Sequence, residues 1–266
     1  MKDYTTMLTD RPTDGLLLVT FNKPDSLNAI GPAMLDELDD LFGSLMNDEE
    51  TKVVVFTGAG RGFCAGADLG AAVAHEGTEH FSDPERFLKL VQERYGSIIL
   101  NIRRIPQVVI SAVNGPCAGG GFCMALASDI RIAAPEAVFV ASFINIGLSG
   151  GELGTTYLLP RLIGLSRASE ILYSGRKVKG EEAEKIGLVN KLVPKETLVQ
   201  ETIDLAGPIL QKSFPALKFT KMALNQNVDA PTLESAINLE NRNQALMVFS
   251  GTFFEMVKHF TAQSKK

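Results

Sequence analysis

Short apolar segments alternate with helical patterns over the first two-thirds of the chain, and this alternation limits the possible folds more than any other feature. Residues 15–22, 52–57 and 107–113 each form an apolar run with the length of a buried strand. Apolar residues at helical spacing follow the first run at 32–45 and precede the third at 84–104. Strands that alternate with helices in this way predict an α/β fold with βαβ units.

The last quarter of the chain, from about residue 200 onward, is helical in pattern and predicts a separate helical layer. No flexible linker precedes it, and Gly207-Pro208 is expected to break or kink its first helix. The 266 residues, 45% of them hydrophobic, can bury one full core. Six apolar positions of this layer are expected to be core or subunit contacts: Leu217, Met222, Leu224, Leu239, Leu246 and Val248.

Composition excludes several classes of protein. A net charge of −5 gives no electrostatic support for binding to nucleic acid or to an anionic membrane. The sequence has no apolar run of about 18 residues that could span a membrane, and its first 15 residues are too polar for a signal peptide. The three cysteines show no disulfide framework, and the three histidines show no metal-ligand spacing. We therefore expect a cytoplasmic protein with free thiols and no metal site.

Two glycine-rich segments each follow a predicted strand, and the first lies at 58–68. A dinucleotide-binding fingerprint read from Gly58 would need glycine where Phe63 stands, and the looser match from Gly60 is not followed by a clear helix. The second segment, 118–121, opens a helix, where free backbone N–H groups form a site for an anion. Its glycines could instead serve only close packing of the helix on a strand.

The two glycine segments lie about 50 residues apart and could each offer one backbone N–H group to the same ligand. Two converging N–H groups form an oxyanion hole, which is often the largest single contribution to catalysis. The pair therefore favours chemistry through an enolate or a tetrahedral intermediate.

Five motifs, taken in this order, resemble those of the crotonase, or enoyl-CoA hydratase/isomerase, superfamily. They span nearly the whole chain and lie at 28–29, 61–69, 114–121, 128–130 and 159–164. The resemblance implies a crotonase-like ββα spiral core in residues 1–200 that carries an acyl-CoA site, and a helical trimerisation region in residues 201–266. It also implies trimers, often paired into hexamers. The ligand would be an acyl-CoA thioester, and no cofactor is implied because coenzyme A is part of the substrate.

The same resemblance assigns individual positions. The N–H groups of Ala67 and Gly120 would hold the thioester oxygen. Asp68 is assigned to substrate binding. The backbone of Phe63, Cys64 and Ala65 would flank the adenine. Phe260 matches an aromatic residue that borders the coenzyme A site in relatives, whereas the lysine expected three residues later is Gln263, with Lys265 nearby.

Both glutamates that hydratases of this family use are absent. Their positions hold Cys123 and Phe143, and neither side chain can act as a carboxylate base. Cys123 has no nearby histidine in the sequence to activate it as a nucleophile, so it is most simply a small buried residue. Phe143 is assigned to the acyl pocket.

Glu152, in the third glycine-rich loop, is the next acidic residue after Phe143. It could serve simply as an acid in the first turn of the helix expected at 153–162. Some enoyl-CoA and dienoyl-CoA isomerases, and a chlorobenzoyl-CoA dehalogenase, carry an essential acid in this loop. Dehalogenation needs a further histidine, and Arg94 stands roughly at its position. One carboxylate is enough to move a double bond, because it can take a proton from one carbon and return it to another.

The leading hypothesis is therefore isomerisation of an enoyl-CoA through an enolate, with Glu152 as the acid/base. The alternatives are a hydratase with non-standard acid/base residues, an acyl-CoA hydrolase, and a catalytically silent acyl-CoA-binding homologue. RNA binding, known in a related subgroup, is rejected because the helix at 32–47 is acidic. The loop 70–83 is a solvated loop or a further source of polar groups: His75, Glu76, Glu79 and His80.

Overall fold

The computed structural model describes residues 2–70 and 83–263. The candidate polar groups of the loop 70–83, from His75 to His80, lie outside the described residues, as does the side chain of Phe260. Across the described part of the chain, no helix combines the length and apolar character needed to cross a bilayer.

The larger sheet contains six strands among the described residues, in the order β1-β2-β3-β4-β6-β9. Only β1 and β2 run antiparallel, and each later pair is parallel. The central strand β3 is buried along its whole length, which requires cover on both faces of the sheet. The strand bounds are Met7–Asp10 (β1), Leu16–Phe21 (β2), Val53–Gly58 (β3), Val108–Val113 (β4), Ile130–Ala133 (β6) and Lys191–Leu192 (β9).

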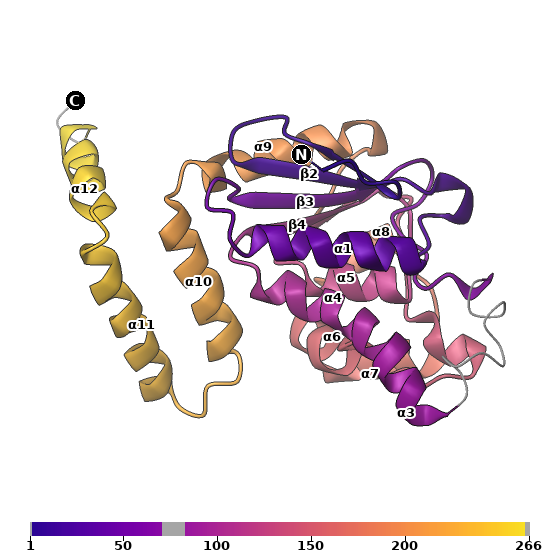
Figure 1. Cartoon of the computed structure of the whole chain (residues 1–266). Helices are drawn as coiled ribbons and strands as arrows, with labels where there is room; N and C mark the ends of the chain where they lie inside the picture. Colours follow the sequence, from indigo (N-terminus) through magenta and orange to yellow (C-terminus); the bar gives the residue numbers. More distant parts are fainter. Residues whose placement is uncertain (1, 71–82, 264–266) are drawn as a thin grey trace.

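Helices pack on both faces of this sheet (Figure 1). The helices α1 (Pro32–Leu45), α4 (Glu93–Arg104) and α5 (Gly120–Ala127) bury apolar side chains on one face, and α9 (Leu198–Leu210) covers the other. The helix predicted at 32–45 is confirmed to the residue, with Pro32 at its first position. The helix predicted at 84–104 consists of α3 (Pro84–Phe87), a π turn labelled η3 (Leu88–Gln92) and α4.

A smaller sheet joins β5 (Pro116–Ala118), β7 (Val138–Val140) and β8 (Val178–Lys179). The chain passes from β4 to β5 to α5, and then from β6 to β7 to α6 (Thr155–Ile163), so each turn places one strand in each sheet before a helix. A parallel bridge between Cys64 and Cys117 extends the smaller sheet toward the loop after β3. The ββα repeat confirms the predicted α/β class.

The expected start of α6 needs a small correction. The sequence pattern placed this helix at 153–162, but it begins at Thr155 because Gly154 has a φ of 82° and so lies outside helical geometry. Further connecting elements are η1 (Pro24–Ser26), η4 (Ser142–Ile146), α7 (Leu165–Ser174), α8 (Gly180–Lys185) and η5 (Lys195–Thr197).

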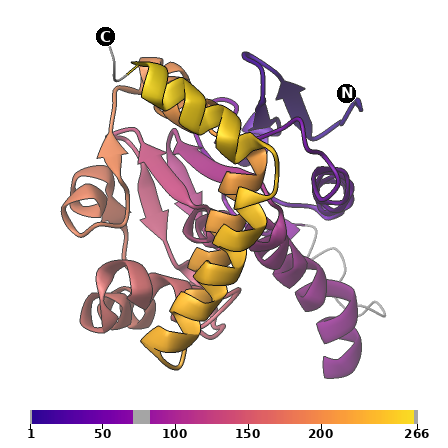
Figure 2. The same ribbon diagram turned by 90° about the vertical axis from the view of Figure 1, so that its left-hand side faces the viewer.

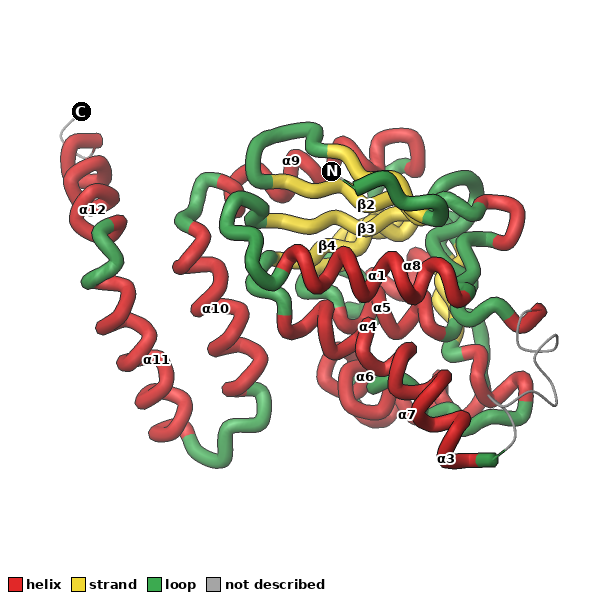
Figure 3. The backbone as a smooth tube through the Cα atoms, in the orientation of Figure 1, coloured by secondary structure: helices red, strands yellow, loops and turns green. Residues whose placement is uncertain are grey.

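The helical C-terminal region consists of α10 (Phe214–Asn227), α11 (Leu233–Val248) and α12 (Thr252–Gln263). α9 continues through Gly207-Pro208 to Leu210, so the break expected at these two residues does not interrupt the helix. α11 and α12 lie on the outer side of α10, away from the sheets, as Figures 2 and 3 show. Leu224 and Leu246, which were expected to make core or subunit contacts, are exposed in the single chain.

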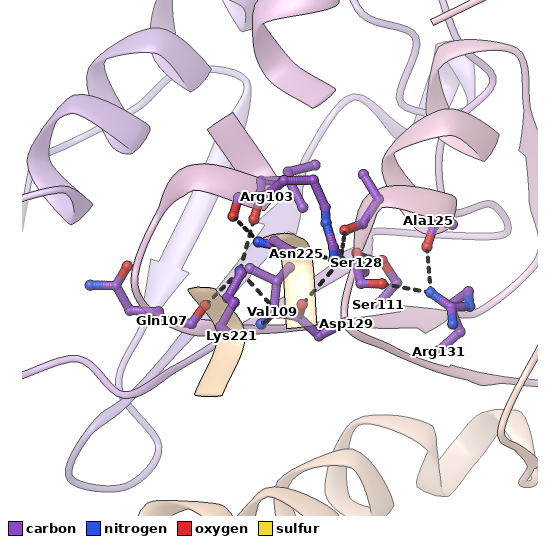
Figure 4. Close-up of polar contacts among 12 residues, drawn as sticks. Arg103, Gln107, Val109, Ser111, Ala125, Ser128, Asp129, Arg131, Lys221 and Asn225 are labelled. Atoms are coloured by element: carbon purple, nitrogen blue, oxygen red, sulfur yellow. Dashed lines mark hydrogen bonds and ion pairs between the residues drawn. The ribbon is translucent and has the colours of Figure 1, made fainter. Parts of the chain in front are cut away.

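A buried polar cluster attaches α10 to the body of the protein (Figure 4). The Lys221 ammonium donates to the carbonyl oxygens of Ile102 and Gln107, both at 2.8 Å, and pairs with Asp129 at 2.9 Å. Asp129 also accepts from the N–H of Val109 and from Arg103. Because burial penalises the charged amine, the pKa of Lys221 is lowered even though Asp129 opposes that shift. The cluster therefore joins α10 to α4, β4 and the start of β6.

Candidate functional site

A cavity of about 470 Å³ opens where the loops after β3 and β5 approach α4 and the loop before α6. It contains six residues predicted for the site: Ala65, Ala67, Asp68, Gly120, Phe143 and Glu152. The rest of its wall is mainly apolar, with Leu35, Phe87, Leu90, Val91, Ile146, Leu148 and Leu153 among the contributors. The cavity is thus suited to an apolar chain with a few polar groups at defined places.

Two buried asparagines fix the glycine-rich loop after β3. The Asn28 amide donates to the carbonyl oxygens of Ala59, Gly62 and Phe63 at 2.9–3.2 Å. The Asn114 amide donates to the carbonyl oxygens of Gly58 and Gly60 at 2.8 and 3.2 Å. These contacts hold the loop that leads to Ala67, and they give a structural role to two of the motifs found in the sequence.

The glycines allow this loop to lie directly against the start of α5. Gly66 has a φ of 89°, and a Cβ there would stand 2.9 Å from both the Ala118 carbonyl oxygen and the Gly120 nitrogen. A Cβ at Gly121 would stand 2.3 Å from the carbonyl oxygen of Cys64. Close packing, considered above as the alternative role of these glycines, therefore occurs at this junction.

The same packing brings two backbone amides to the cavity wall. Gly120 is the first residue of α5, so its N–H has no carbonyl partner within the helix. Within residues 2–70 and 83–263, neither the N–H of Gly120 nor that of Ala67 has a hydrogen-bond acceptor. Two unpaired backbone donors on residues that line one cavity are the groups that an oxyanion hole requires.

Phe63 and Cys64 do not contribute side chains to the described cavity wall. The Phe63 ring packs edge-on against Phe21 at 5.6 Å, and the N–H groups of Phe63 and Cys64 both donate to the Pro116 carbonyl oxygen. Both side chains are fully buried in the core. Only the backbone of these two residues is available for the predicted contact with adenine.

Cys123 lies inside α5 and is fully buried. Its thiol donates a weak hydrogen bond to the Glu152 carbonyl oxygen at 3.8 Å. Burial raises the pKa of Cys123 well above its ordinary value, and the charge of Glu152 acts in the same direction. The thiol therefore stays protonated, which fits the prediction of a small buried residue rather than a nucleophile.

Glu152 lies two residues before Gly154, the N-cap of α6, and is therefore outside the first helical turn. Its N–H donates to the Thr155 hydroxyl, and its carbonyl oxygen accepts from the Thr155 N–H at 2.9 Å. The next residue, Leu153, has a φ of 46°, a strained value for a leucine. The backbone on both sides of this carboxylate is thus held in one conformation.

The sequence patterns did not identify Gln92 as part of the site. Its side-chain amide donates to Oε1 of Glu152 at 3.0 Å, and it lines the same cavity. The available signal in the sequence was the helical spacing. Gln92, Tyr95 and Ile99 lie at positions i, i+3 and i+7, so the polar Gln92 shares the face on which Tyr95 and Ile99 point inward. Arg94, also at the cavity, pairs instead with Asp36 of α1 at 2.5 Å.

The Tyr95 hydroxyl lines the cavity but is already engaged. It donates to the Ile30 carbonyl oxygen at 2.7 Å, and burial raises the pKa of Tyr95 to about 12. A neutral phenol held in this way positions α4 against the loop before α1.

Across the described residues, no three histidine, cysteine, aspartate or glutamate side chains gather as a metal site would require.

Comparisons with known proteins give one consistent family. The family model described as enoyl-CoA hydratase/isomerase matches residues 11–263. A probable enoyl-CoA hydratase, EchA12 of Mycobacterium tuberculosis, is 40% identical over 249 residues, covering 94% of this chain and 87% of that protein.

Solved structures agree with this family. A probable enoyl-CoA hydratase/isomerase from Mycobacterium abscessus is 37% identical with a TM-score of 0.87, covering 97% of this chain and 96% of that one. A monofunctional enoyl-CoA isomerase from M. smegmatis is 40% identical with a TM-score of 0.73, covering 87% of this chain and 98% of that one. These similarities confirm the predicted crotonase-like fold.

Proposed function

Because this chain belongs to the enoyl-CoA hydratase/isomerase family, we propose that it moves the double bond of an enoyl-CoA, with Glu152 as the acid/base. One observation carries the proposal. Glu152 lines the same apolar cavity as Ala67 and Gly120, whose N–H groups are unpaired within the described residues, while the hydratase positions hold Cys123 and Phe143. The 40% identity to a protein named as an enoyl-CoA isomerase supports the same choice.

The reaction needs no group beyond these. The N–H groups of Ala67 and Gly120 hold the thioester oxygen, and the Glu152 carboxylate removes a proton from C2 of a 3-enoyl-CoA. The electron pair moves onto that oxygen to give a dienolate, which the two donors stabilise. Glu152, now protonated, returns the proton to C4, so the double bond ends between C2 and C3 and no atom is gained or lost.

Hydration of a 2-enoyl-CoA is the second candidate, because Asp68 also lines the cavity and could hold a water molecule together with Glu152. The similarity to EchA12, named as a probable hydratase, also favours it. We rank it lower because hydration also needs a water that is held and activated, and the two positions where hydratases of this family carry glutamates for that task hold Cys123 and Phe143.

The deciding experiment compares Glu152→Gln with the wild type in two absorbance assays, isomerisation of a 3-enoyl-CoA and hydration of a 2-enoyl-CoA. Loss of the proton carrier is expected to lower kcat for isomerisation by about 10²- to 10⁴-fold. Glu93→Gln, at the exposed position next to Gln92 in the chain, should keep wild-type activity and serves as the matched control.

Each other outcome assigns a different acid/base residue or a different function. Isomerisation that survives in Glu152→Gln but is lost in Asp68→Asn would transfer the acid/base role to Asp68. Faster hydration than isomerisation in the wild type would favour the hydratase. Release of free coenzyme A would favour the acyl-CoA hydrolase, and tight binding of enoyl-CoA without any reaction would favour the silent binder.

A further inference from the structure

A single side chain restrains the proposed acid. Within the described residues, Gln92 is the only side chain that hydrogen-bonds to the Glu152 carboxylate, with Nε2 at 3.0 Å from Oε1. Both residues are partly buried at the cavity wall. We propose that Gln92 is a positioning residue, which holds one oxygen of Glu152 so that the other faces the acyl chain; this inference rests on the proposed function.

The fold holds Gln92 firmly. It is the last residue of the π turn η3, and α4 begins at the next residue. A π turn inserts one residue into a helix and rotates the next helical turn, and such insertions occur frequently at functional sites. α4 is fixed in turn by the Tyr95 hydroxyl on Ile30 and by Ile98 and Ile102, which are buried in the core. The donor is therefore carried by a rigid element.

Glu152 is held from the opposite side through its backbone. Cys123 and Thr155 both donate to its carbonyl oxygen, and the Thr155 hydroxyl accepts from its N–H. With the backbone fixed, the remaining freedom of the side chain is rotation about its own bonds. The Gln92 amide removes that freedom at one oxygen, which leaves the second oxygen for proton transfer.

The chemistry of a carboxamide suits this task. A lysine or histidine at the same place could exchange a proton with Glu152 and so compete with the substrate. The amide donates a hydrogen bond without titrating, so it orients the carboxylate without taking part in the proton transfer. Cys123, which stands at a hydratase glutamate position, contributes to the same arrangement. Its thiol donates to the carbonyl oxygen of Glu152 and so helps to fix the loop that carries this acid.

The test uses Gln92→Leu, which keeps a similar volume but cannot donate. We expect kcat for isomerisation to fall about 10- to 100-fold, as a misplaced catalytic group does, while KM changes less than about twofold. In deuterated water, the product of Gln92→Leu should contain more solvent deuterium, because a loosely held acid exchanges its proton before returning it. Lys89→Leu, which replaces an exposed side chain of the same π turn, is the matched control and should match the wild type.

A second set of measurements separates this inference from the proposed function. Gln92→Leu should have no further effect on activity in a Glu152→Gln background, because the two side chains act as one unit. Crystal structures of the wild type and Gln92→Leu, both with a saturated acyl-CoA, report on the carboxylate without any turnover. A displaced Glu152 carboxylate in the variant supports the role of Gln92, and an unmoved one overturns it. The proposed function fails separately, if wild type and Glu152→Gln are equally inactive on every enoyl-CoA.

Discussion

Gly66 controls how closely the backbones of Ala67 and Gly120, the two proposed oxyanion donors, can approach each other. It precedes Ala67 in the chain, and its Cα stands 3.7 Å from where a Cβ of Gly120 would lie. Its φ of 89° is one that residues with a side chain rarely adopt. Glycine at position 66 is therefore required both by its positive φ and by the close packing of its backbone against Gly120.

We predict that Gly66→Ala lowers kcat about 100-fold, which is typical for the loss of one oxyanion donor. The added methyl group would contact the Ala118 carbonyl oxygen and the Gly120 nitrogen at 2.9 Å, so it must push the two amides apart. Steady-state kinetics on a 3-enoyl-CoA measures the effect, and circular dichroism checks that the variant is folded.

Gly43→Ala provides the comparison, because it lies inside α1 with no atom within 4 Å of its added Cβ. It should keep full activity and gain about 0.5–1 kcal/mol of stability from the better helix former. A folded Gly66→Ala enzyme with wild-type kcat would contradict the role assigned to Ala67 and Gly120.

The sequence predicted Glu152 but could not predict its surroundings. Glu152 was predicted because it is the next acidic residue after Phe143 and because the resemblance to the crotonase superfamily implies an essential acid in this third glycine-rich loop. Its partner Gln92 lies 60 residues earlier, and the contact depends on how a π turn rotates one helix. Helical spacing could have marked Gln92 as a polar residue on the inward face, but hydrophobic periodicity carries no information about the π turn, so its contact with Glu152 required the structure.

The segment before β1 is attached to α1 chiefly through Glu37, with Asp40 accepting further bonds from Lys2 and Tyr4. Glu37 accepts hydrogen bonds from the N–H and hydroxyl groups of Thr5 and Thr6, at 2.5–3.0 Å. Burial by itself would raise the pKa of Glu37, but these four hydrogen bonds together hold it below its ordinary value of 4.5. The ionised carboxylate therefore stabilises the segment that leads into the edge strand.

Glu37→Gln should destabilise the protein by about 1–2 kcal/mol at neutral pH, because a carboxamide cannot accept all four bonds. A carboxylate whose pKa is lowered on folding contributes fully above its unfolded pKa, and that contribution is lost as pH falls through the lower folded value. The difference between variant and wild type should therefore shrink from pH 7 to about pH 3. Urea unfolding at several pH values measures it.

Glu49→Gln, at an exposed position in the loop after α1, is the control and should leave stability unchanged at every pH. A Glu37→Gln deficit that stays constant down to about pH 3 would contradict the ionic origin of the effect.

Helices and strands were predicted more completely than the contacts between them. Pro32 and the apolar stripe after it defined α1 to the residue. The attachment of α10 depends instead on Lys221, a residue type that is normally exposed. A pattern based on apolar residues cannot anticipate a buried ammonium that three oxygens from distant segments stabilise.

The C-terminal helices expose more apolar surface than a monomer usually does. Leu233 is 76% exposed and Phe249 is 88% exposed, and Leu224, Leu246, Phe254 and Met256 are also exposed. A cavity of about 870 Å³ lies among α10, α11 and α12, with Leu217, Leu224, Met247 and Phe253 in its wall. We propose that copies of this chain associate through α10–α12, as the predicted trimer requires.

Sedimentation velocity at micromolar concentration should therefore find a species of three or six times the chain mass of 28.7 kDa. Leu233→Glu combined with Phe249→Glu places two charges on the exposed apolar surface, and burying each at an interface would cost several kcal/mol. The double variant should shift to smaller species, while Leu8→Glu, exposed on the edge strand β1, should keep the wild-type mass. A wild-type protein that sediments as a monomer would contradict the proposed association. An oligomer unchanged by the double substitution would place the contact on a different surface from α10–α12.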